Sequence, residues 1–353
     1  MTLKIGLIIN PIAGVGAALA WKGTDNVTKA WEAIENGERQ PVWDIAKRAL
    51  QSIKSIDKYE WYLGGEFSHL IQGKVVYQLP TKSDSNNTKS AVAKLIEKDV
   101  DIILFIGGDG TAKDVTEISS EIPILGIPGG VKIFSPCFLH KPEDLGDFLE
   151  KWLGKTNEVD ILDLDDEEYL MGNTISILVG SAIIPESTHI QVGKSSFNST
   201  DDLQTYSLIA ERIREENWLD SKTILVGPGS TMKQIFSQLD LSVSLLGVDI
   251  ISNGQIMKLD CTETEINNHQ IDQIWITPIG SQGHIFGRGN KQIGIKILEL
   301  LQKSDIKIFS TPSKLLETQV LYLDIGNSEL DKKYQGYYHV VTGYYEEVMR
   351  RAE

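Results

Sequence analysis

Apolar residues in the first 150 positions come in short runs that alternate with stretches of helical periodicity. Residues 4–10, 101–106 and 122–127 are short and largely apolar, which predicts strands buried on both faces of a sheet. After Pro41, apolar side chains recur at the i, i+3, i+4, i+7 spacing of one helix face as far as Ile53. Strands that alternate with helices predict βαβ units and therefore a parallel sheet.

Three more elements are predicted in this region. Residues 74–79 are predicted to form a strand, and Thr88 is a suitable N-cap for a helix that continues to residue 98. Pro142 suits the first turn of another helix, in which Glu143 and Asp144 lie at the positive end of the dipole. The expected inner face of that helix consists of Leu145, Phe148, Leu149, Trp152 and Leu153.

The pattern changes after Gly154. Residues 158–168 are strongly acidic, and residues 171–192 alternate between apolar and polar as antiparallel strands do. We therefore expect an α/β fold in two domains, residues 1–155 and 156–353, with the second domain β-rich at its start and α/β after about residue 223. The elements expected there are strands at 223–226, 244–249 and 273–277 and a helix from Thr231.

Composition narrows the functional classes. The 34 Lys and Arg against 49 Asp and Glu give a net charge of −15, which argues against nucleic acid or an anionic membrane as a partner bound by bulk electrostatics. No apolar run approaches the ~18 residues of a membrane span, and the chain starts with a strand-like segment, so we expect a cytoplasmic protein. Cys137 and Cys261 fit neither a zinc pattern nor a disulfide framework, and both are expected to be buried.

The most specific motif is Gly107-Gly108-Asp109-Gly110-Thr111, between a predicted buried strand and a helix. Glycines allow a ligand to approach the backbone, and the start of the helix offers unpaired N–H groups to phosphate. A carboxylate there suits Mg²⁺ or a hydroxyl that loses its proton during phosphoryl transfer. The alternative is a tight turn in which Asp109 caps the helix.

A second loop, Asn10-Pro11-Ile12-Ala13-Gly14, also follows a predicted strand. Ligands of open parallel sheets bind beyond the carboxyl ends of the strands, so the two loops line one crevice if their strands are neighbours. Without that adjacency, the loop is a simple turn between a strand and a helix.

Other loops are candidates for anion binding. Residues 227–231 repeat the order of strand, glycine turn and helix start, with a helix cap as the alternative. Arg288, in the glycine-rich segment 280–290, can bind phosphate through two parallel hydrogen bonds. Lys132 follows a glycine pair, and the alternative for it is a solvated loop lysine. The chain has neither GxxxxGK[ST] nor HExxH, which argues against a P-loop NTPase and a zinc hydrolase.

The pairing of Asn10-Pro11-x-Ala13-Gly14 with residues 107–111 resembles the NAD kinase superfamily, which also holds diacylglycerol and sphingosine kinases. Residues 22–25, 130–132, 227–231 and 277–290 resemble a prokaryotic, largely archaeal branch of predicted ATP-NAD kinases. Similarity to this branch runs over nearly the whole chain.

The resemblance implies a Rossmann-like nucleotide- or phosphate-binding domain followed by a β-rich domain that binds the acceptor. It implies phosphoryl transfer from ATP or polyphosphate to a hydroxyl, first of all the adenosine-ribose 2′-hydroxyl of NAD to give NADP, with Mg²⁺ as cofactor. Asp109 is then the catalytic carboxylate and, with the phosphates, the place for Mg²⁺. The implied phosphate- or nucleotide-binding residues are Asn10, Gly14, Gly107, Gly108, Gly110, Thr111, Lys132, Gly227, Gly229, Ser230, Thr231 and Arg288.

One departure concerns the acceptor. NAD kinases carry an Asn-Glu pair early in the second domain that holds the adenylyl part of NAD, whereas here Asn173 is followed by Thr174. A different small alcohol or a lipid therefore stays open as acceptor, as does a nucleotide-binding sensor without turnover. Oligomers are common in the superfamily, but no apolar stripe in this sequence marks an interface. Donor preference and allosteric control also stay open.

Overall fold

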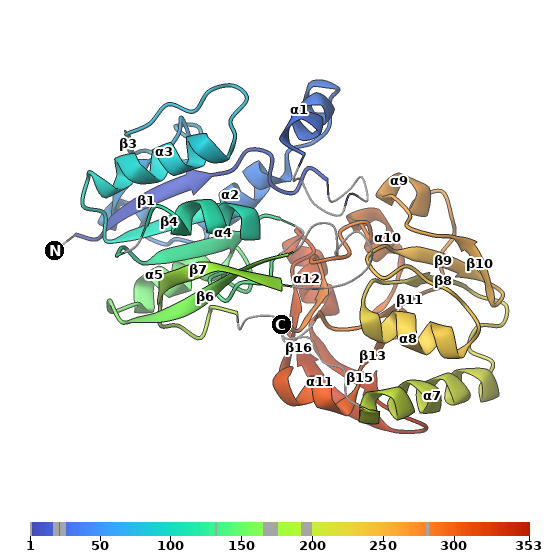
Figure 1. The fold of residues 1–353 in the computed structure, drawn as a ribbon. Coiled ribbons are helices and arrows are strands. Elements are labelled where there is room, and N and C mark those ends of the chain that lie inside the picture. The colour runs from blue at the N-terminus through green and yellow to red at the C-terminus, as the bar shows by residue number, and fades with distance from the viewer. Residues whose placement is uncertain are drawn as a thin grey trace. The chain divides into compact units, whose positions relative to one another are not determined.

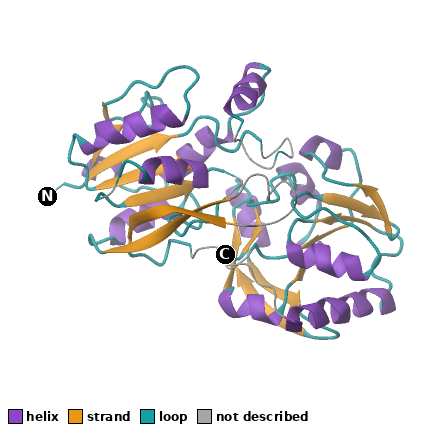
Figure 2. Cartoon of the chain, viewed as in Figure 1, coloured by secondary structure: helices purple, strands orange, loops and turns teal. Residues whose placement is uncertain are grey.

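The computed structural model describes residues 2–16, 21, 26–119, 121–130, 133–164, 176–191, 200–279 and 282–353. The chain divides into two compact units, Met1–Gly16 with Lys22–Gly193, and Ala17–Trp21 with Lys194–Glu353. Figure 1 shows the elements of both units, and Figure 2 distinguishes their helices from their strands. Each unit has a central sheet with helices packed against it.

The first unit contains a five-stranded sheet in the order β3-β2-β1-β4-β5, and all its neighbours are parallel. This confirms the parallel sheet that the alternating pattern predicted. β2 was not predicted, and β3 is shorter than predicted, because only two of the residues 74–79 pair. The strands are β1 Lys4–Ile9, β2 Glu60–Leu63, β3 Lys74–Val75, β4 Ile102–Gly107 and β5 Ile124–Pro128.

Helices cover both faces of this sheet. Alternate residues of β1 face opposite sides, with Leu7 in the core shared with α2 and α5, and Ile8 in the core shared with α3 and α4. Both faces of β1 and β4 are thus buried, which explains their nearly continuous apolar sequence. The helices of the unit are α1 Val27–Glu35, α2 Pro41–Gln51, α3 Ser85–Ile96, α4 Asp109–Thr116 and α5 Asp144–Lys151, with a 3₁₀ turn at Ile56–Lys58.

Two details of these helices differ from expectation. The N-cap of α3 is Asp84, and Thr88 lies buried inside the helix, because the Asp84 and Asn87 side chains each accept the other's backbone N–H in a capping box. Leu153 is 89% exposed instead of facing inward, because α5 ends at Lys151. Leu145, Phe148 and Leu149 are buried as predicted.

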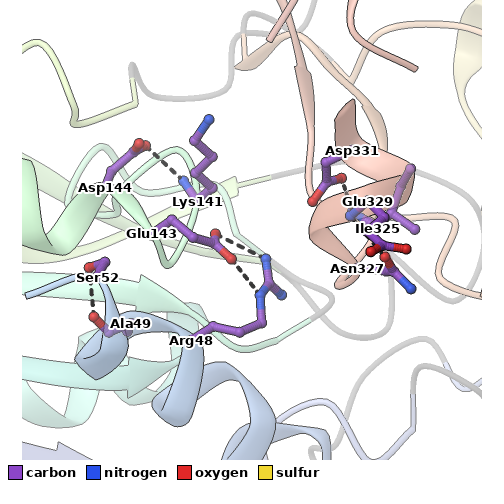
Figure 3. Close-up of polar contacts among 10 residues, drawn as sticks. All are labelled: Arg48, Ala49, Ser52, Lys141, Glu143, Asp144, Ile325, Asn327, Glu329 and Asp331. Carbon is purple, nitrogen blue, oxygen red and sulfur yellow. Dashed lines mark hydrogen bonds and ion pairs between the residues drawn. The ribbon is translucent and has the colours of Figure 1, made fainter. Parts of the chain in front are cut away.

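Close packing and an ion pair join α2 to α5 (Figure 3). Arg48 on α2 donates to both carboxylate oxygens of Glu143, at 2.6 and 3.0 Å. A Cβ on Gly146 would lie 2.1 Å from the carbonyl oxygen of Ser52, so only glycine allows this approach.

Figure 3 also shows, within the second unit, the N–H of Ile325 donating to Asp331.

The acidic and alternating stretch after residue 155 forms an antiparallel pair, β6 Thr156–Leu164 and β7 Ser176–Pro185. Ile161, Ala182 and Ile184 join the core around β4, α3 and α4. The pair therefore belongs to the first unit, which extends to Gly193, whereas the expected boundary fell at residue 155. Buried apolar side chains drive this packing although the strands look acidic.

The second unit is built on a mixed sheet whose nine described strands follow the order β10-β9-β8-β11-β13-β15-β16-β14-β12. Cys261 is buried in its core, and Cys137 is buried in the first unit, as predicted. Its strands are β8 Thr223–Val226, β9 Asp249–Ser252, β10 Gln255–Lys258, β11 Gln273–Ile276, β12 His284–Phe286, β13 Ile306–Phe309, β14 Val320–Leu323, β15 Gly336–Val341 and β16 Glu347–Ala352. Its helices are α7 Thr200–Glu215, α8 Ser230–Gln238, α9 Glu263–Ile266, α10 Ile295–Leu300, α11 Pro312–Glu317 and α12 Ser328–Tyr334, with a 3₁₀ turn at Lys303–Asp305.

One strand of this unit was misplaced by the sequence reading. The expected strand at 244–249 is mostly a loop, and β9 begins at Asp249. The buried Asp249 carboxylate accepts the N–H and the hydroxyl of Ser244, both at 2.6 Å, and the N–H of Asp260 at 2.7 Å. These three hydrogen bonds hold most of residues 244–249 in a loop instead of a strand.

Among the described residues, none of the helices combines the length and apolar character that crossing a membrane requires.

Candidate active site

The loops after β1 and β4 meet at the carboxyl edge of the first sheet, because these two strands are parallel neighbours. The N–H of Asn10 continues the ladder by donating to the carbonyl of Ile106 at 3.0 Å. The side-chain amide of Asn10 donates to the hydroxyl of Thr111, also at 3.0 Å. β1 and β4 are therefore neighbours, as a crevice shared by the two loops requires.

Close backbone contacts explain the glycines of these loops. A Cβ on Gly107 would lie 2.3 Å from Oγ1 of Thr111, and one on Gly14, which has a φ of +79°, would lie 2.7 Å from the carbonyl oxygen of Gly129. The N–H groups of Gly129 and Gly130 both donate to the carbonyl of Gly107. The loops after β1, β4 and β5 thus pack against one another.

A cleft of about 480 Å³ opens beside these loops, within the first unit. A Cβ on Gly110 would meet no atom within 4 Å, so the backbone at the start of α4 is open to this space. Residues of the two motifs that line the cleft are Asn10, Ile12, Ala13, Gly108, Asp109, Gly110 and Thr111. Charged residues that line it are Asp84, Lys89, Lys113, Asp114, Glu117 and Asp163.

The cations of the cleft are paired with carboxylates. Lys89 lies 2.5 Å from Glu117 and 3.7 Å from Asp114, and Lys113 lies 3.7 Å from Asp163. Burial raises the pKa of Asp114 above its usual value. The sequence reading missed Lys89 and Lys113, which resemble ordinary surface lysines until the fold brings α3, α4 and β6 together.

Asp109 is the most buried carboxylate of the cleft, with 1% of its surface exposed. Its Oδ2 accepts the N–H of Phe134 at 2.6 Å, and its Oδ1 accepts that of Ser135 at 3.0 Å. Burial raises the pKa of Asp109 to about 7, although these hydrogen bonds oppose the rise. Asp109 is the first residue of α4 and does not cap it: the N-cap is Gly108.

Several expected site residues or branch-specific segments lie outside the described residues. They are Lys132, residues 22–25, Asn173, Thr174 and Gly280.

In the second unit, the loop after β8 and the segment around Arg288 lie close together. A Cβ on Gly289 would be 4.0 Å from Cγ of Pro228. Gly229, with a φ of +127°, is the N-cap of α8, and no side chain caps that helix. Arg288 is 3% exposed. The two predicted segments, residues 227–231 and the segment around Arg288, are thus neighbours in the fold.

Lys314 is a residue of this second cluster that sequence reasoning missed. It is 8% exposed, and its ammonium donates to the hydroxyls of Thr277 at 3.0 Å and Thr231 at 3.4 Å. It lies on the six-residue helix α11, far along the chain from both threonines. A single lysine in a short helix gives no sequence signal for such burial.

The carboxylates of the cleft are engaged with protein donors and cations. Each oxygen of Asp109 accepts one backbone N–H group and keeps further acceptor capacity, and Asp114 and Glu117 pair with Lys89. In the part of the chain that the structure describes, no three His, Cys, Asp or Glu side chains group as metal ligands.

Comparison with known families agrees with this arrangement. The sequence model described as ATP-NAD kinase N-terminal domain matches residues 5–156, and that described as ATP-NAD kinase C-terminal domain matches residues 219–351. No curated protein matches the chain. The first matched stretch contains residues 10–14 and 107–111, and the second contains residues 227–231 and 277–290. The chain therefore belongs to the NAD kinase superfamily, and it is a phosphotransferase with an alcohol group as acceptor.

Proposed function

We propose that this kinase transfers the γ-phosphoryl group of ATP to the adenosine-ribose 2′-hydroxyl of NAD, which yields NADP and ADP. The observation that carries the proposal is the carboxylate of Asp109, buried and fixed by two N–H groups at the wall of the cleft. Family membership supports NAD and ATP as the substrates.

In the proposed reaction, Asp109 accepts the proton of the acceptor hydroxyl. The hydroxyl oxygen forms a bond to the γ-phosphorus while the bond from that phosphorus to the β–γ bridging oxygen breaks, which leaves ADP. A pKa of about 7 suits a general base at neutral pH, because a substantial fraction is ionised and the ionised form is still basic. The open backbone at Gly110 and the first turn of α4 supply N–H donors for phosphate.

We further propose that Mg²⁺ reaches this site bound to the phosphates of the donor, where it would neutralise their charge. The second unit would contribute to acceptor binding through residues 227–231 and the segment around Arg288. Arg288 suits a second phosphate because its guanidinium can donate two parallel hydrogen bonds.

The test is an NADP-formation assay on the purified full chain with NAD, Mg²⁺ and either ATP or polyphosphate. Asp109→Asn should lower kcat by at least about 100-fold, as expected for loss of a general base. Asp114→Asn is the matched control: it removes a carboxylate from the same helix and the same cleft. We expect it to cost less than about tenfold, because Asp114 is already engaged with Lys89 and Ser85.

Each other outcome identifies a different function. ATP consumption with a polyol or a lipid alcohol, but not with NAD, would replace NAD as the acceptor. Tight nucleotide binding without phosphoryl transfer to any acceptor would indicate a sensor. Full activity of Asp109→Asn would refute the role of this carboxylate while leaving the kinase activity intact.

A further inference from the structure

The carboxylate of Asp109 is held by a loop that lies outside its own helix. Its two hydrogen-bond donors, the N–H groups of Phe134 and Ser135, are 25 and 26 residues further along the chain, after β5. The direction in which Asp109 faces the cleft therefore depends on whatever holds this peptide segment in place.

The side chain of Ser135 ties the segment to β6. Ser135 is fully buried, and its Oγ donates to the carbonyl of Leu162 at 2.9 Å and accepts the N–H of Leu162 at 3.0 Å. Leu162 lies beside the irregularity of the β6–β7 ladder between Ile161 and Leu162. Strand irregularities leave backbone groups without partners in the ladder. Here the hydroxyl of Ser135 bonds both the N–H and the carbonyl of Leu162.

Gln191 holds the same peptide from another side. Its side-chain amide donates to the carbonyl of Ser135 at 3.0 Å, and its own N–H donates to the carbonyl of Phe138 at 2.8 Å. Gln191 is 1% exposed. The N–H, side chain and carbonyl of Ser135 are thus bonded to Asp109, Leu162 and Gln191 respectively.

We propose that Ser135 and Gln191 are positioning residues for the catalytic carboxylate: together they fix the peptide that orients Asp109 toward the acceptor hydroxyl. This inference rests on the proposed kinase function. A carboxylate has about four lone-pair sites, so the two N–H bonds set its direction and leave acceptor capacity for the substrate proton. Misplacement of such a group by about 1 Å is costly for catalysis.

The same contacts influence the proton affinity of Asp109. Burial raises its pKa, and the hydrogen bonds from Ser135 and Phe134 lower it. Of the charged groups that the structure describes, Asp163 on β6 raises it further, and Lys113 on α4 pairs with Asp163.

Cys137, in the same loop as Ser135, adds no charge. Its thiol is buried, and both burial and the nearby Asp109 raise its pKa well above the usual value. Loosening the Ser135 peptide should therefore raise the pKa of Asp109, because a hydrogen bond that favours the charged form weakens while the neighbouring charges stay in place.

The experiment measures Asp109 directly, by ¹³C NMR titration of the full chain carrying ¹³Cγ-labelled aspartate, with the signal assigned through Asp109→Asn. Ser135→Ala removes the bonds to Leu162 and also the side-chain hydrogen bond from Ser135 that lowers the pKa of Asp109. Gln191→Met removes only the amide donor to the carbonyl of Ser135, at nearly constant size. Ser119→Ala is the matched control: Ser119 is also buried and donates to a backbone carbonyl, that of Ile122, at 3.0 Å. It makes no contact with Asp109 that would hold the carboxylate.

We expect Ser135→Ala and Gln191→Met to titrate Asp109 at higher pH than the parent and Ser119→Ala to leave it unchanged. In the NADP assay, kcat/KM below neutral pH should fall by roughly tenfold in the first two variants, with the acid limb moved to higher pH. An Asp109 signal that moves no more in Gln191→Met than in Ser119→Ala would overturn the inference, because Gln191→Met removes no hydrogen bond of the carboxylate itself. Because the titration requires no turnover, it gives its answer even if the kinase proposal fails.

Discussion

Asn10 donates a hydrogen bond from Nδ2 to Oγ1 of Thr111 at 3.0 Å, across 101 positions of the sequence. The same side chain accepts the N–H of Ile12 through Oδ1 at 3.2 Å. One asparagine thus fixes the shape of its own loop and attaches that loop to the first turn of α4. The two glycine-containing motifs therefore behave as one structural unit.

The first prediction is energetic coupling between these residues. Asn10→Ala and Thr111→Val should each lower the free energy of unfolding by about 1–2 kcal/mol, because each leaves a buried or half-buried partner without its hydrogen bond. The double variant should lose less than the sum by at least about 0.5 kcal/mol. Urea unfolding of the four proteins measures this cycle. If the two losses of unfolding free energy were simply additive, the hydrogen bond between Asn10 and Thr111 would contribute no coupling energy.

The second prediction separates steric from chemical roles of glycine. Gly107→Ala should destabilise the chain by about 1–3 kcal/mol, because its Cβ would lie 2.3 Å from Oγ1 of Thr111. Gly110→Ala has no neighbour within 4 Å and should be neutral or slightly stabilising, since alanine favours the helix. Thermal unfolding compares the two. Equal destabilisation by both would mean that the close contact at Gly107 has no steric consequence.

Gly110→Ala also tests the cleft. If a phosphate approaches the backbone there, the variant should keep its stability and lose affinity for ATP, because the added methyl group occupies the approach. Isothermal titration calorimetry measures that affinity. Unchanged binding would place the phosphate elsewhere.

Periodicity was enough to predict most elements of the first sheet. β1 and β4 are buried on both faces, so their sequences are nearly all apolar, and the glycine motif between β4 and α4 marks a turn at the carboxyl edge. The N-cap Asp84 was missed because Thr88, four residues later, is also a good capping residue. β9 was displaced because the buried Asp249 organises a loop, which an apolar pattern does not reveal.

The site was predictable only where side chains carry its chemistry. The sequence named Asp109 and Asn10 as candidates, and the structure places both at the cleft. The donors at Phe134 and Ser135 were missed because they act through backbone N–H groups, which every residue except proline possesses. Lys314 was missed because its burial depends on threonines that are distant in sequence. Such contacts follow from topology.

The third prediction links Asp109 to stability. Its pKa is about 7 in the folded chain and 3.8 in a model peptide, so the folded state binds the proton more tightly. The stabilisation is complete below pH 3.8 and is lost as the pH rises to about 7, by about 4 kcal/mol in total. Between roughly pH 5.5 and pH 8 the parent should lose about 2 kcal/mol more than Asp109→Asn does. Urea unfolding at both pH values measures this. Parallel pH dependence of the two proteins would exclude a raised pKa.

The last prediction concerns Asp163, whose negative charge raises the pKa of Asp109. Asp163→Asn removes that repulsion and also frees Lys113 from its ion pair, so both effects favour the ionised form of Asp109. The acid limb of the pH–rate profile should therefore move to lower pH, and activity below neutral pH should rise relative to activity at the optimum. Asp160→Asn makes the same charge change at an exposed position of the same strand and should leave the limb in place. A shift to higher pH in Asp163→Asn would mean that Asp163 supports the ionised carboxylate by a contact other than charge repulsion, and an equal shift in both variants would assign the effect to net charge alone.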